Sequence, residues 1–166
     1  MKFKVGAGIV HPDYGLGHIT AIEEKQFSDI EACRYYKIAF PKLNIWVPIE
    51  AQAAIGLRLV TAKRDLDKYR NVIKGRPVLF NGDLPKGHEE LAGRLKKGSF
   101  QTLCEIVRDL TVSGWQKPLG VSVKTILRKT QERLYQEWAT AAGISIAEAT
   151  KEIDTLLEET HEVTLE

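Results

Sequence analysis

Residues that build metal sites and disulfides are scarce in this 166-residue chain, which has only two cysteines and four histidines. Cys33 and Cys104 lie in different segments without Cys-x-x-Cys spacing, which argues against a disulfide framework and a cysteine-ligated metal site. The histidines are dispersed and form no pair at helical spacing. We therefore expect two buried thiols, no metal and no cofactor.

Long apolar runs and catalytic patterns are also absent from the sequence. No stretch reaches the length of a membrane-spanning helix, and no signal-peptide core follows the first residues, so we expect a cytoplasmic protein without membrane contact. The chain contains no recognisable Ser/His/Asp set, no carboxylate pair at a familiar spacing and no phosphate-binding loop followed by a helix. These absences predict that the protein is not an enzyme.

The chain has an excess of positive charge in its middle. Residues 61–134 contain 16 Lys/Arg and 8 Asp/Glu, a net charge of +8. Residues 1–60 have a net charge of +1 and residues 135–166 of −7, so the whole chain carries only +2. A basic middle beside an acidic tail suggests a face that meets a polyanion, although solvated helix surfaces carry such charge too.

The first sixty residues have the pattern of a small, strongly curved β-barrel. Short apolar runs at Gly8–Val10 and His18–Thr20 flank a turn, His11–Gly17, that contains proline, aspartate and two glycines. Cys33–Phe40 alternates like a strand, and Ile45–Ile49 forms one more short strand. In Cys33–Phe40 we expect the side chains at positions 34, 36, 38 and 40 to face away from those at 35, 37 and 39.

Two residues of the last short strand bear on function. Pro48 cannot donate a ladder hydrogen bond, which predicts an edge strand or a strand end. A sheet edge has unpaired backbone groups that can accept a partner. Trp46 is either a core residue or an exposed anchor, and its residue type alone favours the core, because aromatic side chains usually fill the interior of small barrels.

After Thr61 the strand signals give way to helical periodicity, with a loop at Val78–Pro85. We therefore predict two domains, residues 1–60 and 61–166, and an α+β fold. The predicted helices are Asp65–Lys74, Lys86–Lys97, one that Ser99 caps and Ser113-Gly114 stops, a long one that Ser122 caps and Gly143 ends, and a last one that opens with the capping box Ser145–Glu148.

Several separated motifs occur together in a known order and resemble the CarD family of bacterial transcription regulators. That family shares its N-terminal module with the RNA-polymerase-interacting domain of the transcription–repair coupling factor. The resemblance covers nearly the whole chain and implies a Tudor-like small β-barrel followed by an all-α helical bundle. The motifs are Val5-Gly6, Ile9-Val-His-Pro-x-Tyr-Gly-x-Gly17, Tyr35-Tyr36, Val47-Pro48, Gly56-Leu-Arg58, Glu105–Leu110 and the helix at Lys124–Ala139.

The resemblance implies a function and partners. In family members the barrel docks on the β subunit of RNA polymerase, near its protrusion and β1 lobe. The helical domain rests on the upstream edge of the transcription bubble, where an exposed aromatic wedges into the minor groove and basic side chains hold phosphate. We therefore expect a monomer that binds polymerase and promoter DNA, lies on the nucleoid through polymerase, and stabilises the open complex.

The resemblance also assigns polymerase-binding residues. Family members have basic residues at two positions of this surface. Lys25 occupies the first, in the hairpin, and Trp46 stands at the second, on the edge strand beside Pro48. This assignment places Trp46 on the surface, against the core position that its residue type favours, and replaces a charge by an amphipathic anchor.

In the helical domain, Lys86 and His88 match the start of the helix after the wedge, and Lys124 and Arg128 match basic positions of the long helix. The wedge tryptophan itself is missing, because a gapless alignment places Leu84 at its position. A leucine can still intercalate in part.

Two other interpretations of this loop stay open. Phe80, in the same loop, can serve as the wedge if the loop is displaced, or Leu84 simply packs between helices. The alternative function is a polymerase-binding adaptor whose helical domain recruits a protein partner and does not wedge into DNA. A Tudor-like nucleic-acid-binding barrel that acts without polymerase is a third possibility.

Overall fold

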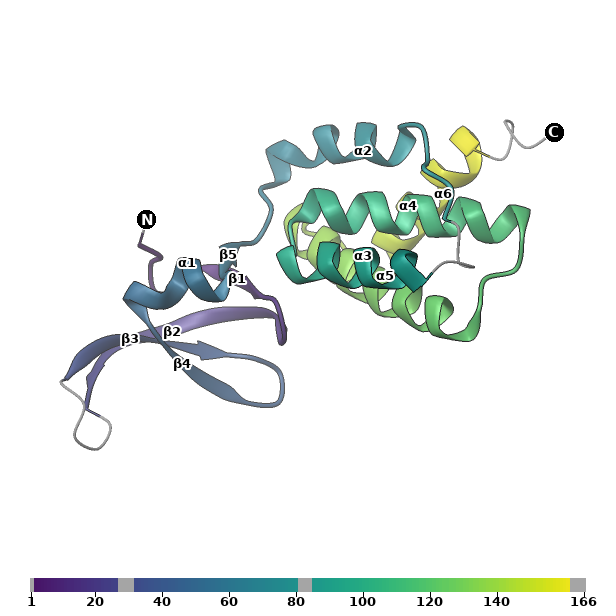
Figure 1. The fold of residues 1–166 in the computed structure, drawn as a ribbon. Helices are drawn as coiled ribbons and strands as arrows, with labels where there is room; N and C mark the ends of the chain where they lie inside the picture. The colour runs from purple at the N-terminus through teal and green to yellow at the C-terminus, as the bar shows by residue number, and fades with distance from the viewer. Residues whose placement is uncertain (1, 27–31, 81–84, 162–166) are drawn as a thin grey trace. The chain divides into compact units, whose positions relative to one another are not determined.

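A computed structural model of the chain describes residues 2–26, 32–80 and 85–161. The chain divides into two compact units, Met1–Val60 and Thr61–Glu166. The first consists mainly of strands and the second of helices (Figure 1). Each unit has its own buried core, and each is described by itself.

The N-terminal unit is a five-stranded antiparallel sheet with the strand order β4-β3-β2-β1-β5. β2 extends well beyond the predicted run at His18–Thr20. A register shift between Ile19 and Ala21 breaks the regular alternation of its side chains, and this hid the length of the strand in the sequence. The elements are β1 (Gly8–His11), β2 (Gly15–Lys25), β3 (Cys33–Ala39), β4 (Asn44–Pro48), a 3-10 turn (Ile49–Ala51), α1 (Gln52–Ile55) and β5 (Arg58–Leu59).

One side of this sheet is the core of the unit. Tyr36 and Ile38 of β3 are fully buried there, which confirms the predicted alternation of that strand. The Tyr36 hydroxyl donates to Gln52 Oε1 of α1 (2.9 Å) and accepts from the Phe3 N–H (2.9 Å), so the buried phenol has two polar partners. Pro48 is the last residue of β4, an edge strand, as predicted.

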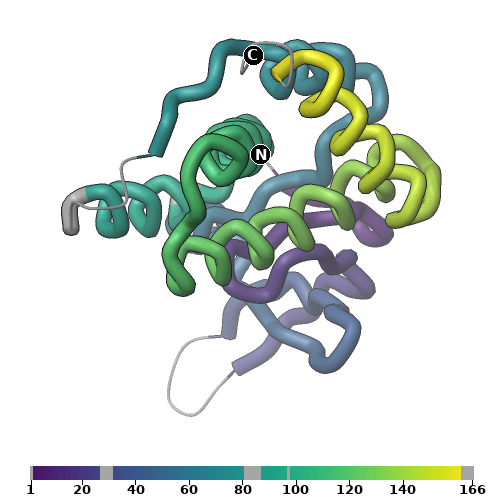
Figure 2. The backbone as a smooth tube through the Cα atoms, turned by 90° about the vertical axis from the view of Figure 1, so that its right-hand side faces the viewer, coloured from purple at the N-terminus to yellow at the C-terminus, as the bar shows by residue number. Residues whose placement is uncertain are grey.

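The C-terminal unit packs its helices around α4. Figure 2 looks roughly along α4, with α2, α3, α5 and α6 around it. One apolar cluster joins α2, α4, α5 and α6, and a second joins α3, α4 and α5. The elements are a 3-10 turn (Lys63–Asp65), α2 (Leu66–Lys74), α3 (Pro85–Lys97), α4 (Phe100–Gln116), α5 (Val121–Ala142) and α6 (Ile146–His161).

Two predicted helix starts are confirmed by their caps. The Ser99 Oγ accepts the N–H of Thr102 (3.1 Å) at the start of α4. The Ser145 Oγ accepts the N–H of Glu148 (3.0 Å), which is the serine half of the expected capping box, and the Ser145 hydroxyl donates to Glu148 Oε1 (3.1 Å).

Two predicted helix boundaries are wrong. α4 continues through Ser113 and Gly114 to Gln116, and inside the helix the Ser113 hydroxyl donates to the Asp109 carbonyl (2.6 Å). A Cβ added at Gly114 would lie 3.4 Å from Leu119, so the small residue allows the returning chain to pack closely. At the start of α5, Gly120 occupies the cap position, and Ser122 already lies within the helix.

Candidate functional site

The outer face of the sheet brings the three predicted polymerase-binding residues together. In the antiparallel register, Trp46 of β4 lies opposite Lys37 of β3, and Pro48 lies opposite Tyr35. Tyr35 in turn lies opposite Glu23 of β2, two residues before Lys25. Because side chains alternate along each strand, all of them project from the side away from the core.

Trp46 is the centre of this face. Its indole Nε1–H donates to Glu23 Oε2 over 3.0 Å. The Lys25 Nζ lies 4.0 Å from the centre of its ring and the Lys37 Nζ 5.6 Å, which are both cation–π distances. The Lys25 ammonium also lies 3.5 Å from Glu23 Oε2.

The electrostatics of this face favour a charged Glu23. The hydrogen bond from Trp46 is the main cause that lowers the pKa of Glu23; desolvation opposes it, and the nearby Lys25 ammonium adds to the lowering. Glu23 therefore stays ionised and holds the indole in one orientation between two lysines. The core position that residue type favoured for Trp46 is wrong, because the side chain is only half-buried and lies outside the core cluster.

Sequence reasoning missed two members of this face, Glu23 and Lys37. The i, i+2 spacing of Glu23 and Lys25 was a usable signal, since it places both side chains on one face of a strand. The position of Lys37 beside Trp46 depends on the pairing of β3 with β4, and no local pattern contains that information.

In the helical unit, two polar residues of α4 hold the segment that precedes α3. The Val78 N–H donates to Asp109 Oδ1 (3.0 Å), and the Phe80 N–H donates to Ser113 Oγ (2.8 Å). The Phe80 ring is half-buried against the α3–α4–α5 cluster and meets the His88 ring edge-on at 6.0 Å. Moving Phe80 out as a wedge would therefore break several contacts. Leu84 lies outside the described residues, as does the side chain of Lys86, and their predicted roles stay predictions.

Asp109 itself is positioned by its neighbour in the Glu105–Leu110 motif. The Arg108 Nε lies 2.9 Å from Asp109 Oδ1, and its Nη1 donates to the Val72 carbonyl at the end of α2 (2.8 Å). Both side chains are more than nine-tenths buried. This buried ion pair ties α2, α4 and the segment at Val78 together, which gives the motif a structural role.

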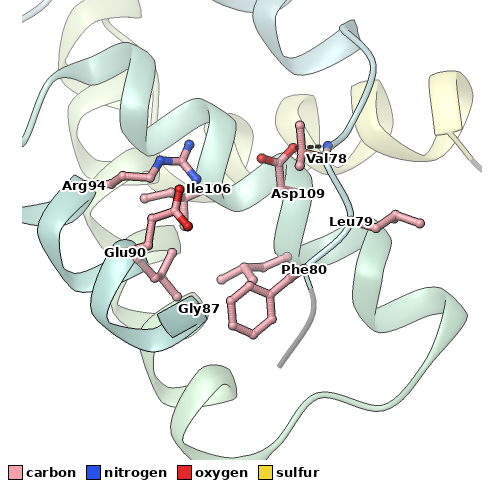
Figure 3. A pocket seen from close by; sticks show the side chains of 10 residues that line it. Val78, Leu79, Phe80, Gly87, Glu90, Arg94, Ile106 and Asp109 are labelled. Carbon is pink, nitrogen blue, oxygen red and sulfur yellow. Dashed lines mark hydrogen bonds between the residues drawn. The ribbon is translucent and has the colours of Figure 1, made fainter. Parts of the chain in front are cut away.

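A cavity of about 410 Å³ lies beside this segment. Figure 3 shows Phe80 and Ile106 at the cavity, with Glu90 and Arg94 at its rim on the α3 side. Val78 and Leu79 also line it and are largely exposed. The apolar lining with a few polar groups at the edge is suited to an apolar side chain of a partner.

Lys124 and Arg128 lie on α5, whereas His88 lies on α3. Both are exposed and one turn apart on α5. Tyr135, eleven residues after Lys124, continues the same stripe, and its hydroxyl donates to Asp154 of α6 (3.0 Å). Ile126, which packs in the apolar cluster with Phe80, lies on another side of α5. Helical periodicity therefore sets Lys124 and Arg128 apart from the side of α5 that packs in that cluster.

Two further features concern the part of the chain that the structure describes. No group of three or more His, Cys, Asp or Glu residues within it is arranged to hold a metal ion. Of the helices described, none is both long and apolar enough to cross a lipid bilayer.

Comparisons with known proteins agree with this architecture. The CarD-like/TRCF RID domain model matches residues 3–60, and the CarD C-terminal domain model matches residues 71–154. The chain belongs to the CarD family. This CarD-family protein is also 28% identical over 151 residues to YdeB, a candidate transcription factor of Bacillus subtilis (strain 168), an alignment that covers 86% of this chain and 94% of YdeB. The family is one of transcription factors that interact with RNA polymerase.

Proposed function

We propose that this CarD-family protein binds the β subunit of RNA polymerase, at the β1 lobe and protrusion, through the outer face of its sheet. The observation that carries the proposal is Trp46, half-exposed on the edge strand and held between Glu23 and two lysines. A fixed aromatic loses little side-chain entropy when it is buried by a partner, and tryptophan is the residue most enriched among binding hot spots. In the complex, Lys25 and Lys37 would contact acidic groups of the β subunit around Trp46.

The helical unit would then contact promoter DNA at the upstream edge of the bubble and stabilise the open complex. Support comes from the net charge of +8 in residues 61–134 and from the exposed Lys124 and Arg128 on α5. Basic side chains bind phosphates without reading the base sequence. Attachment to polymerase raises the local concentration of this unit at the DNA, so its intrinsic DNA affinity can be low.

The second candidate is an adaptor whose helical unit binds a protein. Val78 and Leu79 favour it, because they expose 69% and 50% of their surface beside the cavity of about 410 Å³. Exposed aliphatic side chains next to an apolar cavity are typical of protein-binding sites.

A reconstituted promoter assay distinguishes the two functions. The full chain is added to RNA polymerase on one promoter, and the lifetime of the open complex is measured after a competitor challenge. We expect a longer lifetime with the native chain and a shorter one with the double variant Lys124→Ala/Arg128→Ala, whose polymerase affinity should be native. Lys151→Ala, which removes an exposed lysine from α6, is the matched control.

Three results of this assay would count against parts of the proposal. A native chain that binds polymerase without changing the lifetime supports the adaptor. A double variant that acts like the native chain removes Lys124 and Arg128 from the DNA contact. A chain that fails to bind polymerase at all refutes the docking proposal.

A further inference from the structure

The sheet face proposed to bind polymerase carries a carboxylate next to its central tryptophan, where an acidic partner would be repelled. Glu23 Oε2 lies 3.5 Å from the Lys25 Nζ and offsets part of the positive charge that would attract that partner. The side chains of Glu23 and Lys25 each expose 34% of their surface, so a partner can reach both. Charge attraction alone would be stronger without Glu23, and its presence on this face therefore needs another explanation.

Glu23 and Trp46 meet across three strands. β4, β3 and β2 lie side by side in that order (Figure 1). Trp46 of β4 is paired with Lys37 of β3, whereas Glu23 of β2 is paired with Tyr35 of β3. Two strand spacings amount to about 10 Å, which neither side chain spans alone. The 3.0 Å hydrogen bond from the indole Nε1–H to Glu23 Oε2 therefore requires the ring to extend over β3 toward β2.

The indole also has room on the other side of its strand. β4 is an edge strand, and no strand in the described part of the chain pairs with its outer side. Tryptophan has several staggered rotamers, and some of them turn the ring away from β3. The bond to Glu23, together with the Lys25 Nζ at 4.0 Å from the ring centre, holds the ring over the sheet. An aromatic that is fixed before binding loses less side-chain entropy when a partner covers it.

We propose that Glu23 is a positioning residue for the polymerase contact. Its carboxylate fixes the Trp46 indole across β3, so that the ring meets the β subunit in an orientation that is already set. This inference rests on the proposed polymerase-binding function and adds a residue to it. Glu23 then has two opposed effects on binding. As a hydrogen-bond acceptor it favours the complex, and as a negative charge beside Lys25 it opposes an acidic partner.

Two neutral substitutions at position 23 separate these effects in the full chain. Glu23→Gln removes the charge and keeps a carbonyl oxygen that can accept the indole N–H, whereas Glu23→Leu removes both. The affinity of each variant for core RNA polymerase is measured by biolayer interferometry at one salt concentration. We expect Glu23→Gln to bind at least as tightly as the native chain. Glu23→Leu should bind about threefold to tenfold more weakly than Glu23→Gln, the effect of one side chain that must be immobilised on binding.

A double-mutant cycle and the indole N–H signal test whether Glu23 acts through Trp46. In the Trp46→Ala background, Glu23→Leu should bind as well as Glu23→Gln, because no indole is left to position. In NMR spectra of the isotope-labelled chain, the Trp46 N–H signal is identified by its absence in Trp46→Phe. This signal should shift in Glu23→Leu toward the position of an indole that is hydrogen-bonded to water, and it should stay near its native position in Glu23→Gln.

Glu24→Gln and Glu24→Leu are the matched controls. Glu24 is the next residue of β2, is exposed, and is paired with Arg34 of β3, so its side chain projects from the other side of the strand. The two controls make the same charge change without removing a contact of Trp46. They should bind polymerase with equal affinity, and thermal melting of every variant separates loss of binding from loss of fold.

The outcomes separate this inference from the function on which it rests. If Glu23→Leu binds as tightly as Glu23→Gln or more tightly, the positioning role is wrong, because only the acceptor was meant to differ between them. The same affinity difference in the Trp46→Ala background, or an unshifted indole signal in Glu23→Leu, would also overturn it. If Trp46→Ala itself binds polymerase with native affinity, the outer face of the sheet is not the docking surface and the proposed function fails.

Discussion

Replacement of Trp46 by alanine should separate binding from stability in the N-terminal unit. The side chain is half-buried on the outer face of β4, outside the core cluster of the sheet. If that face binds polymerase, the indole is its largest apolar contact. Truncation of such an anchor costs about 2 kcal/mol or more of binding free energy. At 1.4 kcal/mol for each factor of ten, polymerase affinity should fall about 30-fold.

The same change should have only a small effect on folding. Trp46→Ala removes the cation–π contact with Lys25, which is worth about 0.5–1 kcal/mol at an exposed site. It leaves no cavity in the core. By contrast, Trp138 is fully buried in the helical unit, and a buried tryptophan replaced by alanine costs about 3–5 kcal/mol. Trp138→Ala is therefore the stability reference for this experiment.

The assay measures the affinity of the full chain for core RNA polymerase by biolayer interferometry, beside thermal melting of each variant. Trp46→Phe retains a ring near Lys25 but loses the N–H that donates to Glu23, so its affinity should fall between those of the native chain and the alanine variant. A Trp46→Ala protein that melts much lower than the native chain, yet binds polymerase normally when folded, would refute the interface assignment.

Three further predictions concern the helical unit. Lys124→Ala and Arg128→Ala should each reduce the slope of log affinity against log salt concentration for promoter DNA by about 0.9, whereas Lys151→Ala should leave it unchanged. Leu84→Trp should lengthen the open-complex lifetime and Leu84→Ala should shorten it; a shorter lifetime in Phe80→Ala alone would instead identify Phe80 as the wedge. Glu137→Ala should lower the free energy of unfolding in urea by about 1–3 kcal/mol. The reason is that the buried Glu137 carboxylate accepts both the N–H (3.1 Å) and the hydroxyl (2.7 Å) of Thr61. A variant with the native unfolding midpoint would show that these hydrogen bonds are dispensable.

Local features were predictable from the sequence because they depend on neighbouring residues. The alternation of β3 placed Tyr36 and Ile38 in the core, and Pro48 marked the end of an edge strand. Ser99 and Ser145 marked helix starts, since a capping side chain acts on backbone groups within three residues of it. The separated motifs also identified the CarD family, and the matches to its two domain models confirm that assignment.

Other helix ends could not be read locally. Ser113 and Gly114 resemble a stop signal, yet α4 continues through them, because the chain beyond the helix returns and packs Leu119 close to Gly114. The β-bulge in β2 had the opposite effect, since it hid a long strand behind irregular alternation. In both cases packing that forms only in the folded unit overrides the local preference.

The amino-acid sequence specifies which side chains are available: a tryptophan two residues before an edge proline, lysines in the neighbouring strands, and a basic middle with lysine and arginine on a long helix. Which of these side chains meet depends on how the strands pair and how the helices pack. The pairing of β2, β3 and β4 gathers Glu23, Lys25 and Lys37 around Trp46, whereas the packing of α5 buries Val123 and leaves the adjacent Lys124 exposed. Strand register and helix rotation set these neighbourhoods, and both follow from the burial of apolar faces over the whole unit.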